Sequence, residues 1–171
     1  KPAFIEAYRQ ALHEFFPDGS MDEMPVIVSE KHFARVTALL EGQTAVVGGE
    51  FDEKTRFVAP TLLGGVSPDS PVMQEEIFGP IIPMQPFKTL DEAIEKANDT
   101  IYGLSSYFFG HNAKEISKAF EGMEAGEIFI NGSGGTEQVP HAGVKQSGVG
   151  CDKSPWSLEE YFDFKYCAMI P

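Results

Sequence analysis

Helical and strand-like patterns alternate through the second half of this sequence, and this alternation restricts the fold more than any other feature. The strand-like segments are residues 81–87, 105–109 and 127–130. Thr89 with Glu92 three positions later forms a capping box for the first intervening helix, and Asn112 can cap the second. Because strands and helices that alternate at this spacing favour right-handed crossovers, we predict an α/β fold with a mostly parallel sheet and flanking helices.

The first half of the sequence is less regular, but it predicts two helices and two extended segments. One helix follows Pro2, where an apolar stripe repeats at helical spacing. Ser29 can cap the second helix. Residues 44–48 and 56–66 have an extended pattern, and Pro60 indicates that the longer segment is an edge strand or a bent strand.

Length and charge exclude several classes of protein. The 171 residues suffice for one domain with its own core. A formal net charge of −13 argues against nucleic acid and anionic membranes as partners, because no excess of basic residues is present to neutralise phosphates. No apolar run approaches the ~20 residues of a membrane span. The chain begins at Lys1 with no signal-peptide pattern, and we expect it to be a piece of a longer protein.

Residues 74–80, with the sequence QEEIFGP, place two adjacent carboxylates beside an aromatic ring. A carboxylate at the edge between a strand and a helix can accept hydrogen bonds from ribose hydroxyls, and a neighbouring ring can pack on a flat heterocycle. The alternative is a solvated glutamate pair ahead of a buried phenylalanine, which the composition of this stretch alone favours.

A long irregular segment, residues 131–155, follows the last predicted strand and is rich in Gly and Ser. Segments of this length in compact domains are usually functional or disordered. Its glycines match neither a dinucleotide fingerprint nor a P-loop, and the four histidines have no metal-ligand spacing, so we predict no metal site. His141 is the histidine that we retain as a candidate.

The two cysteines, Cys151 and Cys167, are too few for a disulfide scaffold, so we predict a reducing, cytoplasmic location. A nucleophilic thiolate needs a cationic neighbour or a helix N-terminus, and Lys153 is close to Cys151. Free cysteines are more often inert, so the residues by themselves supply no complete catalytic set.

Five motifs occur in order along nearly the whole chain. They are FVAPTL at residues 57–62, EEIFGP at 75–80, AN at 97–98 with YGL at 102–104, AGEIFIN at 125–131, and GVKQSGVG at 143–150. Together they resemble the C-terminal third of an NAD(P)-dependent aldehyde dehydrogenase. The resemblance implies that residues 1–158 are the C-terminal part of the catalytic domain and that residues 159–171 hold a terminal strand for oligomerisation.

The resemblance also implies a chemistry. In that family an aldehyde is oxidised to a carboxylic acid through a cysteine thiohemiacetal, and NAD or NADP accepts the hydride. The nucleophile and the general base of the family would lie upstream of Lys1, and neither Cys151 nor Cys167 matches the context of the nucleophile. No catalytic residue is therefore carried over, and we expect this chain to be inactive by itself.

Six positions match contact residues of the family. The resemblance implies that Glu76 holds the nicotinamide ribose, that Phe78 packs near the nicotinamide, and that Leu104 faces the same pocket. The implied substrate-pocket residues are Gly134, Thr136 and His141. His141-Ala142-Gly143 stands where the family usually has Phe-Gly-Gly, which exchanges an apolar wall for a hydrogen-bonding one. The identity of the aldehyde stays open.

A final strand that joins a neighbouring subunit would give a homodimer or a homotetramer, and the aromatic and β-branched residues 161–170 suit that role. Pairing within the chain is the alternative. Two other hypotheses remain for the function: a non-enzymatic acidic α/β assembly module, and a pseudoenzyme whose upstream cysteine has been replaced.

Overall fold

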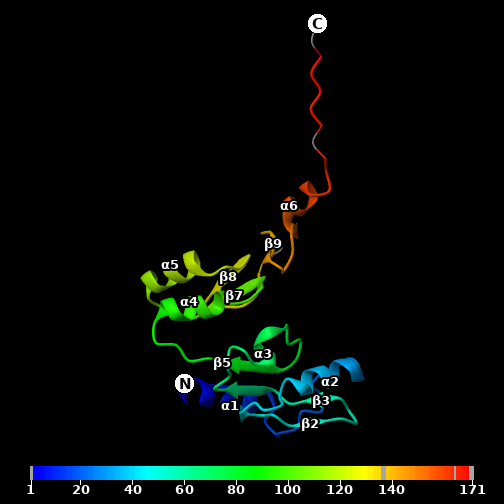
Figure 1. Ribbon diagram of the computed structural model, residues 1–171, viewed down its shortest axis with the longest axis vertical. Helices are drawn as coiled ribbons and strands as arrows, with labels where there is room; N and C mark the ends of the chain where they lie inside the picture. The colour runs from blue at the N-terminus through cyan, green and yellow to red at the C-terminus, as the bar shows by residue number, and fades with distance from the viewer. Residues whose placement is uncertain (1, 136–137, 164, 170–171) are drawn as a thin grey trace. The chain divides into compact units, whose positions relative to one another are not determined.

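The chain divides into two compact units, Lys1–Pro86 and Phe87–Pro171. The computed structural model describes residues 2–135, 138–163 and 165–169 (Figure 1). Each unit has its own strands and helices, and residues 74–80 lie in the first unit whereas residues 131–155 lie in the second.

The first unit is built around a three-stranded sheet of order β1-β4-β5. Its elements are α1 (Pro2–Phe15), α2 (Glu30–Ala38), β1 (Ala45–Val47), β2 (Phe51–Asp52), β3 (Phe57–Val58), β4 (Thr61–Gly64), α3 (Pro71–Gln74) and β5 (Ile81–Met84). The central strand β4 pairs antiparallel with β1 and parallel with β5. The predicted first helix is confirmed, and so is the Ser29 cap, whose hydroxyl accepts a hydrogen bond from the His32 amide at 3.3 Å.

The core of the first unit lies between α2 and this sheet. Its buried members are Phe33, Val36, Leu39, Val58, Leu63, Val66, Val72 and Ile81. Ile77, in the loop between α3 and β5, is half-buried and packs against the same cluster. Since burying an aliphatic side chain contributes about 1.5–3 kcal/mol, this cluster fixes α2 and the loop after α3 together.

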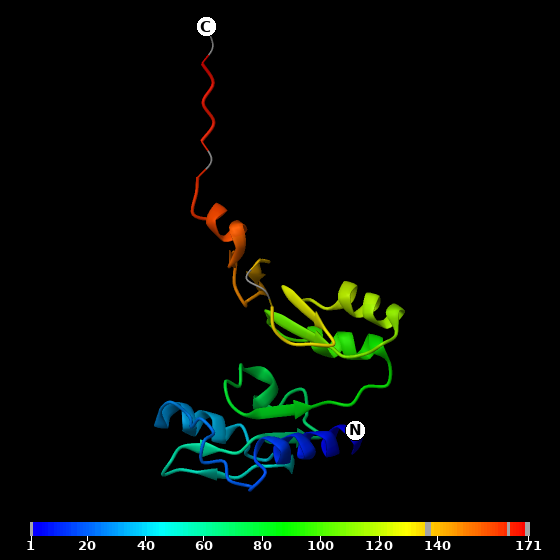
Figure 2. The same cartoon turned by 180° about the vertical axis from the view of Figure 1, so that it is seen from behind.

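The second unit contains two further helices beside a parallel strand pair. Its elements are α4 (Leu90–Asn98), β6 (Tyr102–Gly103), β7 (Ser105–Phe108), α5 (Ala113–Gly122), β8 (Glu127–Ile130), β9 (His141–Ala142), β10 (Val144–Lys145), β11 (Cys151–Asp152) and α6 (Ser154–Glu159). Strands β7 and β8 pair in parallel, and α4 packs against α5 next to them (Figure 2). The predicted caps are confirmed, because Thr89 and Asn112 accept hydrogen bonds from amides of the following turns.

The α/β class is confirmed, but the sheets are small and of mixed direction. Parallel pairing occurs in β4–β5 and β7–β8. The pairs β1–β4, β2–β3, β6–β10 and β9–β11 are antiparallel. The prediction of a mostly parallel sheet therefore holds for only part of the fold, because antiparallel pairs predominate among the described residues and β5 pairs with β4 rather than with β7 or β8.

The irregular segment after β8 returns to the β6 strand and passes close to the backbone at two glycines, Gly103 and Gly126. Strand β10 pairs with β6, so the chain returns to a strand that lies about forty residues earlier. A Cβ atom built on Gly126 would fall on the carbonyl oxygen of Ala142. One on Gly103 would lie 2.6 Å from the carbonyl oxygen of Glu124 and 2.6 Å from a methyl carbon of Val144. The absence of side chains at these two glycines allows the crossing.

The terminal segment has no partner strand within the described part of this chain. Residues 165–169 form neither helix nor strand (Figure 1). Their large side chains are exposed, with 90% of Tyr166 and 95% of Met169 accessible to solvent. The predicted terminal strand is therefore not formed in the described residues of this chain, and pairing with another subunit stays a prediction.

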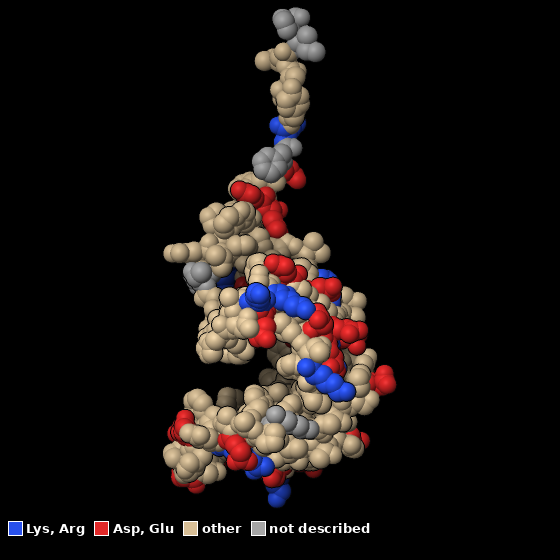
Figure 3. All heavy atoms as spheres, turned by 90° about the vertical axis from the view of Figure 1, so that its left-hand side faces the viewer, with Lys and Arg blue, Asp and Glu red and all other residues tan. Residues whose placement is uncertain are grey.

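The surface carries more acidic than basic side chains. Figure 3 shows acidic side chains spread over both units, with fewer basic ones among them, as a net charge of −13 requires. Within the described ranges, none of the helices has the length and apolar character needed to cross a lipid bilayer.

Gly126→Ala should destabilise the second unit by about 2 kcal/mol or more, because the added methyl group forces the backbone at Ala142 to move. Gly132→Ala is the matched control, since a Cβ atom there meets only the carbonyl oxygen of Ile130 at 3.9 Å. The control should change stability by no more than about 0.5 kcal/mol. Thermal unfolding midpoints of the intact protein measure both effects, and equal midpoints for the two variants would contradict the close crossing.

Candidate functional site

The loop between α3 and β5 presents alternate side chains to opposite sides. Ile77 packs against the core, whereas Glu76 and Phe78 on either side of it are exposed. On the inner side, a Cβ atom at Gly79 would lie 2.9 Å from a methyl carbon of Val36 on α2. The loop is therefore pressed against α2 at Ile77 and Gly79, and this contact turns Glu76 and Phe78 outward.

Phe78 is exposed and has an unusual backbone conformation. The residue is 82% accessible and its φ is +48°, in the left-handed region that bulky residues rarely adopt. The interpretation of residues 74–80 as a glutamate pair ahead of a buried phenylalanine is therefore wrong for the ring, because Ile77 takes the inward position. Residues held in such sparsely populated conformations cluster at ligand sites, at a cost of about 1–3 kcal/mol each.

The two neighbouring glutamates of this loop differ in their partners. The Glu75 carboxylate pairs with the Arg35 guanidinium of α2, with a distance of 3.2 Å between Nη1 and Oε2. The Glu76 carboxylate is exposed, and nothing within the described ranges forms a hydrogen bond or an ion pair with it. One carboxylate is thus used within the fold, while the other can accept hydrogen bonds from a ligand.

Glu127, at the start of β8, connects two candidate residues of the second unit. Its amide donates to the carbonyl oxygen of Leu104 at 2.9 Å, and Leu104 itself is 40% exposed between β6 and β7. Its carboxylate accepts from the Ser105 hydroxyl at 3.0 Å, and its Oε1 lies 2.9 Å from Nδ1 of His141. Glu127, a residue that the sequence did not single out, thereby contacts the backbone of Leu104 and the side chain of His141.

The environment of Glu127 favours its ionised form. The contact with His141 is the main reason that the pKa of this carboxyl lies below its usual value, and the Ser105 hydroxyl lowers the pKa further against the opposing effect of burial. Only 14% of the Glu127 side chain is exposed. A carboxylate of this kind can hold the imidazole of His141 in one orientation and fix which ring nitrogen carries the proton.

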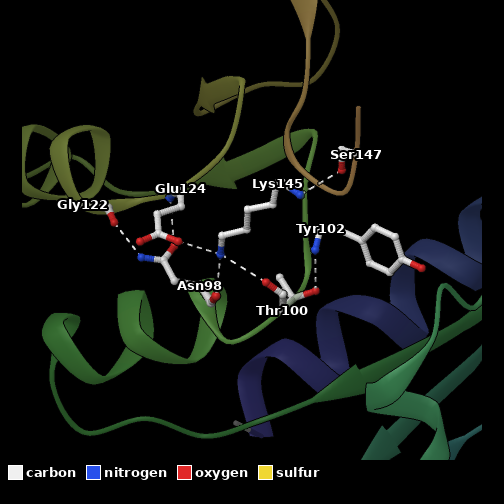
Figure 4. Close-up of polar contacts among 8 residues, drawn as sticks. Asn98, Thr100, Tyr102, Gly122, Glu124, Lys145 and Ser147 are labelled. Carbon is white, nitrogen blue, oxygen red and sulfur yellow. Dashed lines mark hydrogen bonds and ion pairs between the residues drawn. The ribbon is translucent and has the colours of Figure 1, made fainter. Parts of the chain in front are cut away.

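Lys145 fastens the loop that carries His141. Its ammonium donates to the carbonyl oxygens of Asn98 at 2.7 Å and Thr100 at 3.1 Å, and it forms an ion pair with Glu124 at 2.6 Å (Figure 4). The Asn98 side chain completes the cluster by bonding the carbonyl oxygen of Gly122 and the amide of Glu124. Two residues further on, the Ser147 hydroxyl accepts from the amide of Gly103 at 2.9 Å.

The remaining candidates lie in the segment before His141. Gly134 is exposed, has a φ of +95° and has no atom within 4 Å of the place where a Cβ would stand. Thr136 lies outside the described residues. Glu76 and Phe78 therefore share one loop of the first unit, and Leu104, Gly134 and His141 belong to the second.

The cysteine environments do not resemble that of a nucleophile. Burial and the nearby Glu160 carboxylate raise the pKa of the Cys151 thiol, which disfavours the thiolate. Lys153 does not reverse this effect. Cys167 lies exposed in the terminal segment. In the described part of the chain, no group of three or more His, Cys, Asp or Glu side chains could hold a metal ion.

Comparison with known proteins gives matches to aldehyde dehydrogenases. A family model described as "Aldehyde dehydrogenase family" matches residues 1–167. The chain is 34% identical over 174 residues to "Aldehyde dehydrogenase, dimeric NADP-preferring" from Bos taurus, covering 98% of this chain and 72% of that protein. It is 39% identical over 172 residues to "Aldehyde dehydrogenase family 3 member A2" from Rattus norvegicus, covering 96% of this chain and 35% of that one.

A solved structure agrees with the sequence matches. The NAD-dependent aldehyde dehydrogenase from Sinorhizobium meliloti superimposes with a TM-score of 0.77 at 34% identity, over 82% of this chain and 29% of that chain. The chain thus spans about a third of the length of the rat and Sinorhizobium proteins.

The pairing of Glu127 with His141 should make stability depend on pH. Because the folded pKa of Glu127 lies below its unfolded value of about 4.3, the contribution is complete above that value and is lost as pH falls through the folded pKa. Glu127→Gln should therefore lower the unfolding midpoint most near neutral pH, with a difference from wild type that shrinks toward about pH 3. Titration of the carbon-13 shift of the Glu127 carboxyl gives the pKa directly. A value that does not rise in His141→Ala would contradict the assigned cause.

Proposed function

Because the chain belongs to the aldehyde dehydrogenase family, we propose that it forms the cofactor- and substrate-contacting C-terminal part of an enzyme that oxidises an aldehyde to a carboxylic acid. The family membership confirms the resemblance drawn from the five motifs. The relatives use NADP in one case and NAD in another, and either cofactor fits this proposal.

The loop between α3 and β5 supports a role in holding the cofactor. Glu76 offers an exposed carboxylate that can accept hydrogen bonds from the hydroxyls of a ribose. Phe78 presents an exposed ring, held in a strained backbone conformation, that can pack on the flat nicotinamide. This adjacent pair of an available carboxylate and an outward ring is the observation that carries the proposal. The cofactor, when bound, accepts a hydride.

We assign the wall of the substrate pocket to Gly134, Thr136 and His141, and we keep Leu104 as an apolar residue of the cofactor pocket. The His141 imidazole is held by the Glu127 carboxylate, with 2.9 Å between Nδ1 and Oε1. An imidazole that Glu127 orients can form a hydrogen bond with a polar group on the aldehyde. This favours substrates with a hydroxyl, amine or carboxyl group over plain hydrocarbon chains.

The nucleophile and the general base of this reaction would come from residues outside the chain. The raised pKa of the Cys151 thiol supports this, because it disfavours the nucleophilic thiolate at that position. The chain alone is then inactive. Its low cysteine content also fits a cytoplasmic location.

Residues 161–163 and 165–169 suit a role in assembly. The segment exposes Tyr161, Tyr166 and Met169 and pairs with no strand in the described part of its own chain. An extended segment of this kind can add to a sheet edge of another subunit and give a dimer or a tetramer. The bovine relative is named as dimeric.

Glu76→Gln in the full-length protein should slow hydride transfer roughly ten- to a hundredfold, because a hydrogen bond from ribose to a charged group contributes about 1.5–3 kcal/mol. The thermal unfolding midpoint should stay the same, since the side chain has no partner in the described fold. Single-turnover formation of the reduced cofactor measures the rate. The exposed Glu41, changed to Gln, is the matched control. An unchanged rate with a lowered midpoint would refute the assignment.

Deleting residues 161–171 should shift the assembly to smaller species in light scattering, because the terminal segment would no longer reach a neighbouring sheet. A double substitution, Tyr166→Ser with Met169→Ser, keeps the backbone and tests whether side-chain burial contributes. An unaltered mass after the deletion would place the segment within its own subunit.

A further inference from the structure

We propose that Arg35 is a positioning residue for the cofactor, which acts by fixing the backbone on which Glu76 and Phe78 stand. The inference rests on the proposed function, because it assumes that this loop contacts the cofactor. Arg35 lies on α2, forty residues before the loop in sequence, and none of the five motifs includes it.

The Arg35 guanidinium binds three consecutive residues of the loop. Its Nη1 donates to the Glu75 carboxylate at 3.2 Å and to the carbonyl oxygen of Glu76 at 3.2 Å. Its Nη2 donates to the carbonyl oxygen of Ile77 at 2.7 Å. A planar fork of donors can hold two carbonyl groups at once, which a single ammonium group does less well.

The two carbonyl contacts determine how the candidate side chains point. The carbonyl oxygen of Glu76 fixes the peptide plane between Glu76 and Ile77, and that of Ile77 fixes the next plane. The second plane is one of the two that define φ of Phe78, which is +48°. Arg35 therefore holds the peptide group about which the strained conformation of Phe78 is formed.

The helix that carries Arg35 is anchored in the core of the first unit. The next residue on α2, Val36, is fully buried and approaches Gly79 on the far side of Phe78. The loop is thus held before Phe78 by Arg35 and after it by Val36. Since 29% of the Arg35 side chain is exposed, water is partly excluded from its hydrogen bonds.

The ion pair with Glu75 is the lesser part of this arrangement. The Glu75 side chain is 42% exposed, and exposed ion pairs contribute little. The carbonyl contacts should therefore carry the effect. Loss of the carbonyl contacts and loss of the ion pair should therefore have different effects, and only the first should weaken the positioning of the loop.

The test measures cofactor affinity by titration calorimetry of the full-length protein with NAD+ and with NADP+. Arg35→Ala should weaken binding of the preferred cofactor about tenfold, as expected for hydrogen bonds from a charged donor. Glu75→Gln should change it less than about twofold. Arg9→Ala is the matched control, because Arg9 also donates from a helix to a carbonyl oxygen, that of Val46, but away from this loop.

A second comparison asks whether Arg35 acts through the two outward side chains. In a protein that already carries Glu76→Gln and Phe78→Ala, Arg35→Ala should add less than about a twofold loss of affinity. A full additional tenfold loss would overturn the inference, since Arg35 would then act without them. Arg35→Lys keeps the charge and the aliphatic stem, so it folds even where the alanine variant does not, and it should weaken binding about threefold.

The outcomes separate the two proposals. If Glu76→Gln weakens cofactor binding and neither Arg35→Ala nor Arg35→Lys does, the positioning role is wrong and the proposed function stands. If Glu76→Gln and Phe78→Ala both leave affinity unchanged, the loop does not contact the cofactor, and the role of Arg35 is overturned with it.

Discussion

The packing of Ile77 against the core of the first unit decides the geometry of the loop after α3. A side chain that points inward at this position obliges its two neighbours to point outward, and these neighbours are Glu76 and Phe78. The strained φ of Phe78 persists because the backbone is held on both sides, by the Arg35 guanidinium and by the contact of Gly79 with Val36. Packing of Ile77 against the core therefore keeps the Glu76 carboxylate and the Phe78 side chain exposed on the surface.

Both units use the same physical device to hold an irregular loop. One cationic side chain donates to two backbone carbonyl groups and is neutralised by one carboxylate. In the first unit Arg35 bonds the carbonyl oxygens of residues 76 and 77 and pairs with Glu75. In the second, Lys145 bonds those of residues 98 and 100 and pairs with Glu124 (Figure 4). Segments without a repeating ladder need such contacts to satisfy their carbonyl groups.

Features encoded locally could be predicted from the sequence, and features that depend on distant residues could not. Ser29, Thr89 and Asn112 cap helices where expected, because a cap needs only the next few residues. The two-residue strands β9, β10 and β11 were missed, since so short an element has no period. Glu127 was missed for another reason: its partners Ser105 and His141 lie 22 and 14 positions away, and only the fold brings them together. The outward direction of Phe78 likewise depends on α2.

The crossing of the chain at Gly103 and Gly126 has a consequence for loop grafting. The segment from His141 to Ser147 does not stand on the surface as an independent module, because it rests on two backbone positions that have no room for a side chain. Transplanting this segment between homologous scaffolds requires both glycines to move with it, along with the cluster of Asn98, Glu124 and Lys145. The segment, the two glycines and the cluster therefore have to be exchanged together.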